Sequence, residues 1–204
     1  MTEHFYRPAD GHRLRHDPLN SIIAPRPIGW IGTRSETGVR NLAPYSFFNV
    51  FNYTPPIIGF CSLGAKDSVG NARQTGVFTW NLATRGQAEQ VNATSATVPA
   101  EVDEYALAGL EPVPATDIAA DRVGGAPVSF ECRVASIVQL QRADGVAIDS
   151  WLVLGEVVAV HIDDRLLVDG LYRTALADPI LRGGGPTAFY TISEAHRFDL
   201  IRPA

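Results

Sequence analysis

The chain has 204 residues, a net charge of −5 and a mean hydropathy of +0.02. This length suits one hydrophobic core, and 46% hydrophobic with 19% charged residues is the composition of a globular chain, which excludes a disordered or fibrous protein. The acidic balance and the scattered arginines argue against a nucleic-acid partner, because phosphate backbones are held by clustered Lys and Arg.

The first 20 residues are polar and of mixed charge, so we expect an N-terminal arm, followed by one domain over residues 21–204. The arm lacks the apolar segment of a secretory signal. The sequence also contains no run of about 18 apolar residues, which a membrane-spanning helix would need. Cys61 and Cys132 lie in apolar runs without a CxxC motif, which indicates reduced, packed thiols. Together these features predict a cytoplasmic location with no membrane association.

Short strand signals begin near residue 27. We expect strands over 27–33, over VRNLAPYSFF (39–48) and over PPIIGFCSL (55–63), with a hairpin turn at Glu36-Thr37-Gly38. Three consecutive strands joined by short turns favour an antiparallel meander over a βαβ unit. This part of the chain therefore predicts a sheet built from neighbouring strands.

The next segment, VGNARQTG, predicts a helix that ends at Gly76, with Asp67 and Ser68 as residues of N-cap type. A strand over 77–84, one or two helices over 86–110 broken at Pro99, and a loop over 111–127 follow. Apolar strands are expected over 128–140 and 151–163, with Gly155 at a bulge or close approach. The chain is therefore predicted to be mainly β, an antiparallel barrel with a few peripheral helices.

The sequence lacks the motifs GxGxxG, GxxxxGK[ST], HExxH and GxSxG. No histidine pair has metal-ligand spacing unless His12 and His16 share a helix, for which the polar arm has no apolar face. We therefore expect no metal site, and we expect His161, at the end of a buried strand, to be structural. No set of residues predicts a catalytic role.

Two stretches suggest binding. In GAKDSVGN (64–71) the only lysine, Lys66, lies directly before a predicted helix start, where an ammonium, a hydroxyl and free N–H groups suit a phosphate. The alternative is a capped helix with an exposed lysine. In NLAPYSFFN (41–49), one face is aromatic and the other carries amides and hydroxyls. This pattern fits either a core strand with a polar rim or one wall of a site for a flat, uncharged group.

Several motifs in order make the chain resemble the flavin-reductase-like family of FMN-binding split β-barrels, in particular its flavoredoxin-like branch. The motifs are PRPIGWIGT (25–33), GVRNLAPYSFFN (38–49), PPIIGFCS (55–62), KDSVGNARQTGVFTWNL (66–82), GEVVAVHID (155–163) and RGGGPTAFY (182–190). The resemblance implies an FMN-binding oxidoreductase that passes electrons from NAD(P)H to free flavin, a partner oxygenase or another acceptor. It also implies a homodimer. The alternative is a flavoredoxin-type FMN carrier, or a flavin-binding protein, without NAD(P)H turnover of its own.

The resemblance also implies the FMN-binding residues. Those at the ring and ribityl chain would be Asn41, Ala43, Tyr45, Ser46, Phe47, Phe48 and Asn49; those at the ribityl-phosphate end would be Ser62, Lys66, Asp67 and Ser68; and those beside the flavin would be Arg26, Pro27 and Ile28. One position departs from the pattern. Family members that use NADH commonly carry a histidine before the GEV strand, where this chain has Ser150 and Trp151. Trp151 could stack on a nicotinamide or cover the flavin, so the resemblance supports FMN binding more directly than NAD(P)H oxidation.

Overall fold

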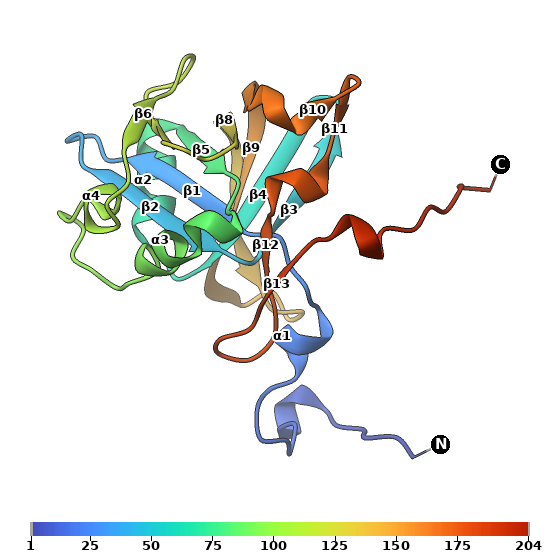
Figure 1. Ribbon diagram of the computed structural model, residues 1–204. Coiled ribbons are helices and arrows are strands. Elements are labelled where there is room, and N and C mark those ends of the chain that lie inside the picture. Colours follow the sequence, from blue (N-terminus) through green and yellow to red (C-terminus); the bar gives the residue numbers. More distant parts are fainter. Residues whose placement is uncertain (1, 204) are drawn as a thin grey trace.

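The computed structural model describes residues 2–203, and its centre is one seven-stranded antiparallel sheet (Figure 1). In spatial order the strands are β2 (Arg40–Tyr45), β1 (Gly29–Arg34), β5 (Val77–Asn81), β8 (Val128–Gln141), β9 (Ala147–Ile162), β4 (Pro56–Leu63) and β3 (Phe48–Tyr53). Apolar, β-branched and aromatic residues dominate these segments, as is typical of strands.

The sheet closes because its two edges are consecutive in the chain. β2 and β3 lie at opposite ends of the strand order, yet only Ser46 and Phe47 separate them. The backbone N–H of Cys61 on β4 donates to the Phe47 carbonyl at 2.7 Å. The sheet must therefore curl until its edges meet, which confirms the predicted split barrel.

This closure corrects the expected meander. The predicted strand over 39–48 divides at Ser46 and Phe47, so β2 pairs only with β1 while β3 pairs with β4. Apolar runs separated by short turns look the same whether the chain returns to a neighbouring strand or crosses to the other edge of a closing sheet. Pairing partners across the barrel decide between them.

The barrel interior is filled by one hydrophobic cluster. Its buried members are Ile31, Ile58, Phe60, Val69, Ala72, Phe78, Cys132 and Val153. Gly155 is a close approach, as predicted: a Cβ there would lie 2.4 Å from the Phe78 ring. Close contacts of this kind are typical of interiors packed as densely as organic crystals.

A second cluster lies on the outer face of β1 and β2. Trp30, Leu42, Val91 and Tyr105 are buried there, under α3 (Ala88–Ala93) and α4 (Glu104–Leu107). The Trp30 indole N–H donates to Thr94 Oγ1 at 2.9 Å, so the buried ring keeps a polar partner. The predicted helical region 86–110 thus consists of two short helices separated by irregular chain that includes Pro99.

α2 (Asp67–Thr75) covers one end of the barrel through Val69 and Ala72. It ends at Gly76, whose φ of 71° is left-handed, so the predicted stop is confirmed. The predicted start is wrong in detail, because Lys66 is the N-cap residue and neither Asp67 nor Ser68 caps the helix with its side chain. A tertiary contact explains this: the Ser68 hydroxyl donates to Asn41 Oδ1 at 2.8 Å.

The region 111–127 is not the loop that its Pro, Gly and Asp content predicts. It holds the hairpin of β6 (Pro112–Pro114) and β7 (Asp121–Val123), which packs on the sheet. The Val123 N–H donates to Asn81 Oδ1 at 2.8 Å, and the Asp121 carbonyl accepts from Thr79 Oγ1 at 2.7 Å. Contacts with β5, distant in sequence, therefore order a segment of low strand propensity.

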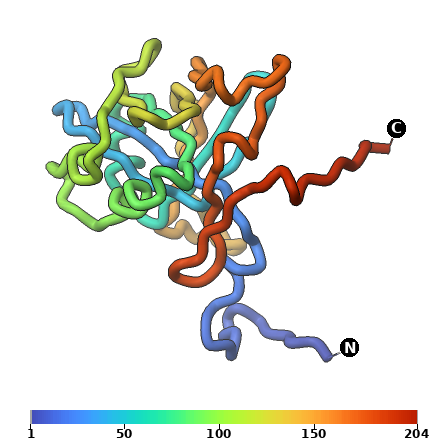
Figure 2. The backbone as a smooth tube through the Cα atoms, viewed as in Figure 1, coloured from blue at the N-terminus to red at the C-terminus, as the bar shows by residue number. Residues whose placement is uncertain are grey.

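The remaining elements are short. They are α1 (Leu19–Ile22), the strand pairs β10 (Leu167–Val168) with β11 (Leu171–Tyr172) and β12 (Ile180–Arg182) with β13 (Phe189–Thr191), and 3-10 turns at Pro8–Asp10, Arg85–Gln87, Asp164–Leu166, Thr174–Ala177 and Glu194–His196. Both ends of the chain leave the barrel, the N-terminal arm and the C-terminal segment projecting in different directions (Figures 1 and 2).

The structure also tests the predictions for His161 and the cysteines. His161 Nε2 lies 2.7 Å from the buried Glu131 carboxylate, as expected for a structural histidine, and both cysteines are free thiols. Within residues 2–203 no helix has the length and apolar character needed to cross a membrane. No group of three His, Cys, Asp or Glu side chains in that range is arranged to hold a metal ion.

Candidate functional site

A cleft runs beside β2 and consists of two adjoining hollows of about 230 and 280 Å³ that share Pro44 and Ser95. The first is lined by Asn41, Ala43, Pro44, Tyr45, Lys66, Asp67, Ser68, Thr94, Ser95, Ala96, Thr97, Val98 and Glu104. The second is lined by Ile28, Pro44, Ser46, Val91, Asn92, Ser95, Arg182, Pro186 and Phe189. We call the two together the β2 cleft. Their combined size falls in the range of about 300–1,000 Å³ usual for cofactor sites.

One end of the β2 cleft is suited to an anion. Lys66 is exposed there at the start of α2, and its ammonium forms no ion pair within residues 2–203. The first N–H groups of a helix have no intrahelical acceptor, and the helix dipole places partial positive charge at this end. The N–H groups of Asp67 and Ser68 are in these positions. An unpaired ammonium and free N–H groups therefore converge on the cleft, although the Asp67 carboxylate lies beside them.

A buried polar network supports this end of the cleft. Asn41 Oδ1 accepts from Thr33 Oγ1 at 3.1 Å and from Ser68 Oγ at 2.8 Å, and Asn41 Nδ2 donates to Glu104 Oε1 at 2.9 Å. The backbone N–H of Leu42 donates to Glu104 Oε2 at 3.1 Å. The network ties β2, α2 and α4 together, so the start of α2 is fixed against the cleft wall. Burial raises the pKa of the Glu104 carboxyl above its usual value.

Tyr45 forms part of the wall between this network and the barrel interior. Its ring packs against Phe60 with centroids 4.7 Å apart, and burial raises the pKa of its phenol. A raised pKa keeps the phenol protonated at neutral pH, so its O–H remains a hydrogen-bond donor. Ala43 and Pro44 beside it are small, which leaves room for a flat group.

The other end of the cleft depends on a residue that the sequence analysis did not select. The Arg182 guanidinium donates to the carbonyls of Ala188 at 2.6 Å, Gly185 at 2.9 Å and Pro186 at 2.8 Å. It also lies over the Phe189 ring, 4.9 Å from the centroid. Arg182 therefore holds the glycine-rich 183–188 loop and Phe189 as one wall of the cleft. The glycine run marked a turn but carried no information about which surface it covers.

The structure brings eight of the predicted site residues to the β2 cleft. They are Ile28, Asn41, Ala43, Tyr45, Ser46, Lys66, Asp67 and Ser68. The others, which do not line it, are Arg26, Pro27, Phe47, Phe48, Asn49 and Ser62.

Arg26 lies beside the cleft and connects segments around it. Its guanidinium donates to the Ile23 carbonyl at 2.9 Å, to the Gly183 carbonyl at 3.3 Å and to Ser46 Oγ at 3.4 Å, and it lies over the half-exposed Phe47 ring. These contacts join the chain after α1 to the glycine-rich loop and to the end of β2. The positive charge is thus already surrounded by acceptors of the protein.

Phe48, Asn49 and Ser62 have local roles in the fold. Phe48 stacks on Trp80 with ring centroids 5.7 Å apart. Asn49 is exposed, and its Oδ1 accepts from the Val50 N–H at 2.8 Å. Ser62 is buried, and its hydroxyl donates to the Gly64 carbonyl at 2.8 Å, which shapes the turn before α2.

Asn92 and the segment 94–98 line the cleft but were predicted only as part of the helical region 86–110, which is wrong for 94–98, an irregular segment. The segment follows α3 and supplies the wall opposite β2 with hydroxyls of Thr94, Ser95 and Thr97. The only sequence signal for this wall of the cleft was a run of small and hydroxyl-bearing residues directly after an amphipathic helix. That run is equally usual for an exposed loop.

Ser150 and Trp151, where this chain departs from the pattern implied by the resemblance, lie on β9 and do not line the cleft. The Trp151 ring packs against the barrel core, with the Arg73 guanidinium of α2 4.6 Å from its centroid. Its indole N–H donates to Asp149 Oδ1 at 3.2 Å. In one copy of the chain, Trp151 therefore covers the barrel end beside α2.

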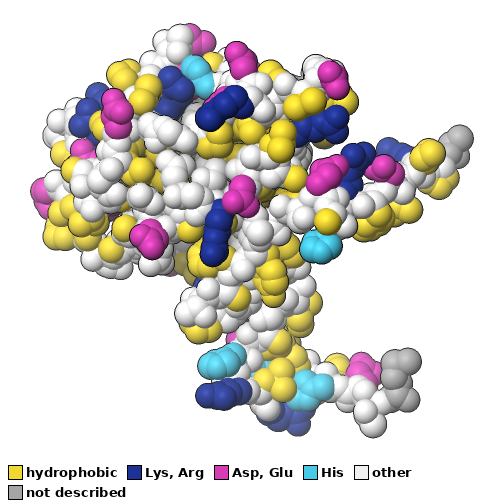
Figure 3. All heavy atoms as spheres, in the orientation of Figure 1, with side chains coloured by type: hydrophobic (Ala, Val, Ile, Leu, Met, Phe, Trp, Pro, Cys, Tyr) yellow, Lys and Arg dark blue, Asp and Glu magenta, His cyan; other side chains and the backbone are white. Residues whose placement is uncertain are grey.

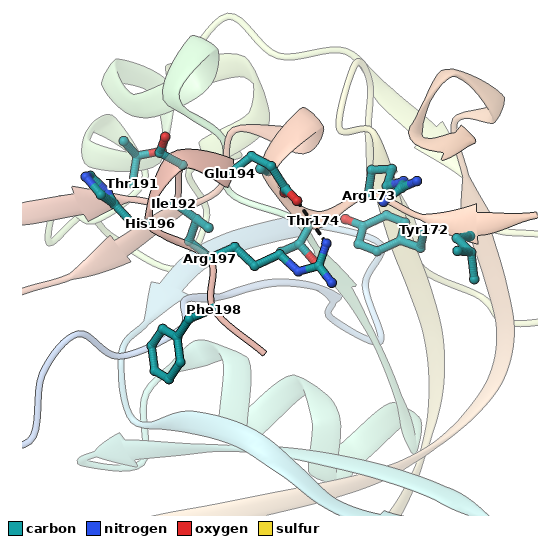
Figure 4. A pocket seen from close by; sticks show the side chains of 12 residues that line it. Tyr172, Arg173, Thr174, Thr191, Ile192, Glu194, His196, Arg197 and Phe198 are labelled. Carbon is teal, nitrogen blue, oxygen red and sulfur yellow. Dashed lines mark hydrogen bonds and ion pairs between the residues drawn. The ribbon is translucent and has the colours of Figure 1, made fainter. Parts of the chain in front are cut away.

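A larger hollow, of about 670 Å³, lies away from β2, between residues 171–175 and the C-terminal segment 191–198 (Figure 4). Figure 4 shows Arg197 directed toward Glu194 across it, where the two form an ion pair at 3.1 Å. Arg197 also pairs with Asp199 at 2.8 Å. One wall of this hollow is the C-terminal segment that projects from the barrel, and none of the predicted site residues lines it. We therefore place the candidate site in the β2 cleft.

Fold and site together define a split-barrel protein with a cofactor-sized cleft that offers an anion-binding end. The flavin reductase like domain model matches residues 22–175, and the chain belongs to that family. Two solved structures at lower identity share the fold: a protein with a split barrel domain from Shewanella frigidimarina, at 24% identity with a TM-score of 0.79 and 90% of each chain covered, and flavoredoxin from Desulfovibrio vulgaris, at 21% identity with a TM-score of 0.75, covering 89% of this chain and 94% of that one.

Individual relatives and solved structures are also similar to this chain. An uncharacterized protein of Aquifex aeolicus is 32% identical over 174 residues, which cover 83% of this chain and 85% of the relative. Nitrilotriacetate monooxygenase component B from Bacillus cereus superposes with a TM-score of 0.82 at 28% identity, covering 89% of this chain and 90% of that one. The 2-nitrobenzoate 2-nitroreductase NbaA from Pseudomonas fluorescens gives a TM-score of 0.79 at 26% identity, covering 91% and 88%.

Proposed function

We propose that this protein is an FMN-binding oxidoreductase that takes electrons from NAD(P)H and passes them to free flavin, a partner oxygenase or another acceptor. The observation that carries the proposal is the unpaired Lys66 at one end of a cofactor-sized cleft, in a chain of the flavin reductase like family. The similarity to a monooxygenase component B supports delivery of electrons to a partner.

The residues of the β2 cleft fit FMN in one orientation. Lys66 and the first N–H groups of α2 suit the phosphate, and the polar side chains of Asn41 and Ser68 lie next along the cleft. The flat ring would then extend past Pro44 and Ser46 toward Arg182 and Phe189. This end presents the apolar surfaces of Pro186 and Phe189, which suit a flat ring, and the guanidinium of Arg182 holds them in place.

Bound FMN would supply the redox chemistry, accepting a hydride from a reduced nicotinamide and releasing electrons to the acceptor. The protein's part is to bind, orient and shield it. Tyr45 and Ser46 offer hydroxyls along the cleft, and donors near the ring would stabilise negative charge on the reduced ring. Such a mechanism needs no acid or base from the protein.

We further propose that the protein is a homodimer. Among the large apolar side chains that one copy leaves exposed are those of edge strand β3, with Tyr53 88% exposed, and of the C-terminal segment, with Leu200 85% and Ile201 96% exposed. Figure 3 shows hydrophobic side chains along the base of the N-terminal arm and along the C-terminal segment. Large apolar side chains left exposed in this way support a protein interface. Light scattering on the purified protein should give twice the chain mass, and the mass of one chain would contradict the proposal.

The activity can be tested by spectroscopy on the purified protein supplied with FMN. We expect flavin absorption bands that bleach when NADH or NADPH is added without oxygen. The rate with each nucleotide would give the preference between them. A protein that neither carries flavin nor takes up added FMN would contradict the proposed cofactor.

A second candidate function is a flavoredoxin-type carrier reduced by another protein. The specific observation in its favour is that no histidine lines the β2 cleft within residues 2–203. Flavin bands that persist with both nucleotides and bleach only with dithionite would favour the carrier over the reductase.

A further inference from the structure

The β2 cleft continues past its Arg182 end into a third hollow, of about 320 Å³. This hollow shares Asn92, Pro186 and Phe189 with the neighbouring part of the cleft. Its other lining residues are Arg85, Ala88, Ile180 and Thr187. We call it the Arg85 hollow. A ligand in the β2 cleft and a second ligand in the Arg85 hollow would therefore meet at Phe189.

The charge of the Arg85 hollow comes from one side chain. Arg85 is exposed in the 3-10 turn before α3, and its guanidinium forms no hydrogen bond or ion pair within residues 2–203. Arg182, by contrast, uses its guanidinium to hold the 183–188 loop. No carboxylate lines the hollow. The hollow therefore presents one positive charge that the protein itself does not use.

The rest of the lining is mostly apolar. Ile180 is buried, and Phe189 and Pro186 present flat apolar surfaces. The Asn92 amide and the Thr187 hydroxyl are the polar groups besides Arg85. An apolar wall with a single guanidinium at its side suits a compound that joins a planar ring to a phosphate or a carboxylate.

We propose that the Arg85 hollow binds the anionic group of the second redox substrate, with the planar part of that substrate directed toward the flavin. This rests on the proposed function, which assigns the flavin phosphate to Lys66 and leaves Arg85 for a different anion. Two sources share the required chemistry: the phosphates of a nicotinamide dinucleotide and the carboxylate of a small aromatic acceptor.

The test compares Arg85→Gln and Arg85→Lys with wild type, using Arg142→Gln as the matched control. Arg142 lies in the β8–β9 turn, where it pairs with Asp144 at 2.9 Å, and it lines neither the Arg85 hollow nor the β2 cleft, so its loss removes the same charge outside both. Calorimetry on the FMN-loaded proteins would measure the affinity for NAD⁺, NADP⁺ and benzoate. FMN affinity would be measured separately by titration of the apoproteins.

We expect Arg85→Gln to weaken binding of at least one probe about tenfold, while Arg85→Lys retains most of the affinity and Arg142→Gln all of it. FMN affinity should stay within about twofold of wild type in all three, because no part of FMN needs Arg85. A loss confined to the dinucleotides would identify their phosphates as the ligand, and a loss confined to benzoate would identify a carboxylate acceptor.

Other outcomes would overturn the inference. If wild type binds FMN but none of the probes, or if Arg85→Gln binds all probes as tightly as wild type, the assignment of Arg85 is wrong while the proposed function stands. If Arg85→Gln loses FMN affinity and Lys66→Ala does not, the flavin lies in the reverse orientation. If wild type does not bind FMN, the proposed function itself fails.

Discussion

The proposed contact between the Lys66 ammonium and the flavin phosphate is the part of the site that a single substitution can test most directly. Replacing Lys66 by Ala removes the ammonium at the start of α2 and leaves the backbone N–H groups of Asp67 and Ser68 in place. A charge-assisted contact contributes about 1.5–3 kcal/mol. Lys66 is exposed, and water screens its charge, so we expect the lower end, about 1.5 kcal/mol. This corresponds to a Kd for FMN about tenfold higher.

The assay is a fluorescence titration of the apoprotein with FMN and, in parallel, with riboflavin, which has the same ring but no phosphate. Lys66→Ala should weaken FMN binding and leave riboflavin binding unchanged, and the difference between the two effects isolates the phosphate contact. The FMN effect should shrink at high salt, since exposed charges are screened. Arg142→Gln serves again as the control for a lost positive charge.

Equal FMN affinity in Lys66→Ala and wild type would refute this placement of the phosphate. An equal loss for FMN and riboflavin would show that Lys66 acts through the fold of the cleft and not through the phosphate. A fold defect would also appear as a lower melting temperature. Because Lys66 has no ion pair to lose within residues 2–203, we expect the melting temperature to be unchanged.

Two further predictions concern stability. Burial raises the pKa of Glu104, so the folded state binds a proton more tightly than the unfolded state and the unfolding free energy should fall as the pH rises from about 4.5 through the raised pKa. Denaturant titrations over this range should show that decrease in wild type and not in Glu104→Gln; identical pH profiles would contradict the assignment. Gly155→Ala would place a Cβ 2.4 Å from the Phe78 ring and should lower the unfolding free energy by about 1–3 kcal/mol. Its control is Gly70→Ala on α2, where a Cβ meets no atom within 4 Å, and an equal effect of both changes would refute the steric argument.

Much of the fold could be read from local patterns. The strands over 27–33, 55–63, 77–84, 128–140 and 151–163 were predicted close to their observed positions, because alternating or continuous apolar residues bounded by turn residues report local burial. The end of α2 at Gly76 was also predicted from a local signal, because the left-handed backbone that ends a helix favours glycine. The motifs around residues 41–49 and 66–68 supported the family.

The site was predicted less completely. The lysine before a helix start indicated Lys66 from the residues alone, whereas Asn41 was implied by the family resemblance. Arg182 and the segment 94–98 were not selected, because nothing in their own neighbourhood distinguishes a cleft wall from an exposed loop. Phe48 was implied with its neighbours as a flavin contact; in the structure it stacks on Trp80 and does not line the β2 cleft.

The sequence by itself thus determined the β class, most strand positions, the helix at 67–75 and the family. Tertiary structure alone decided that β2 and β3 lie on opposite edges of a closing sheet, since strand register depends on partners far apart in the chain. The same closure places α2, the chain after α3 and the 183–188 loop around β2. A binding cleft assembled from such distant segments is defined by their contacts in space, which no local pattern of residues contains.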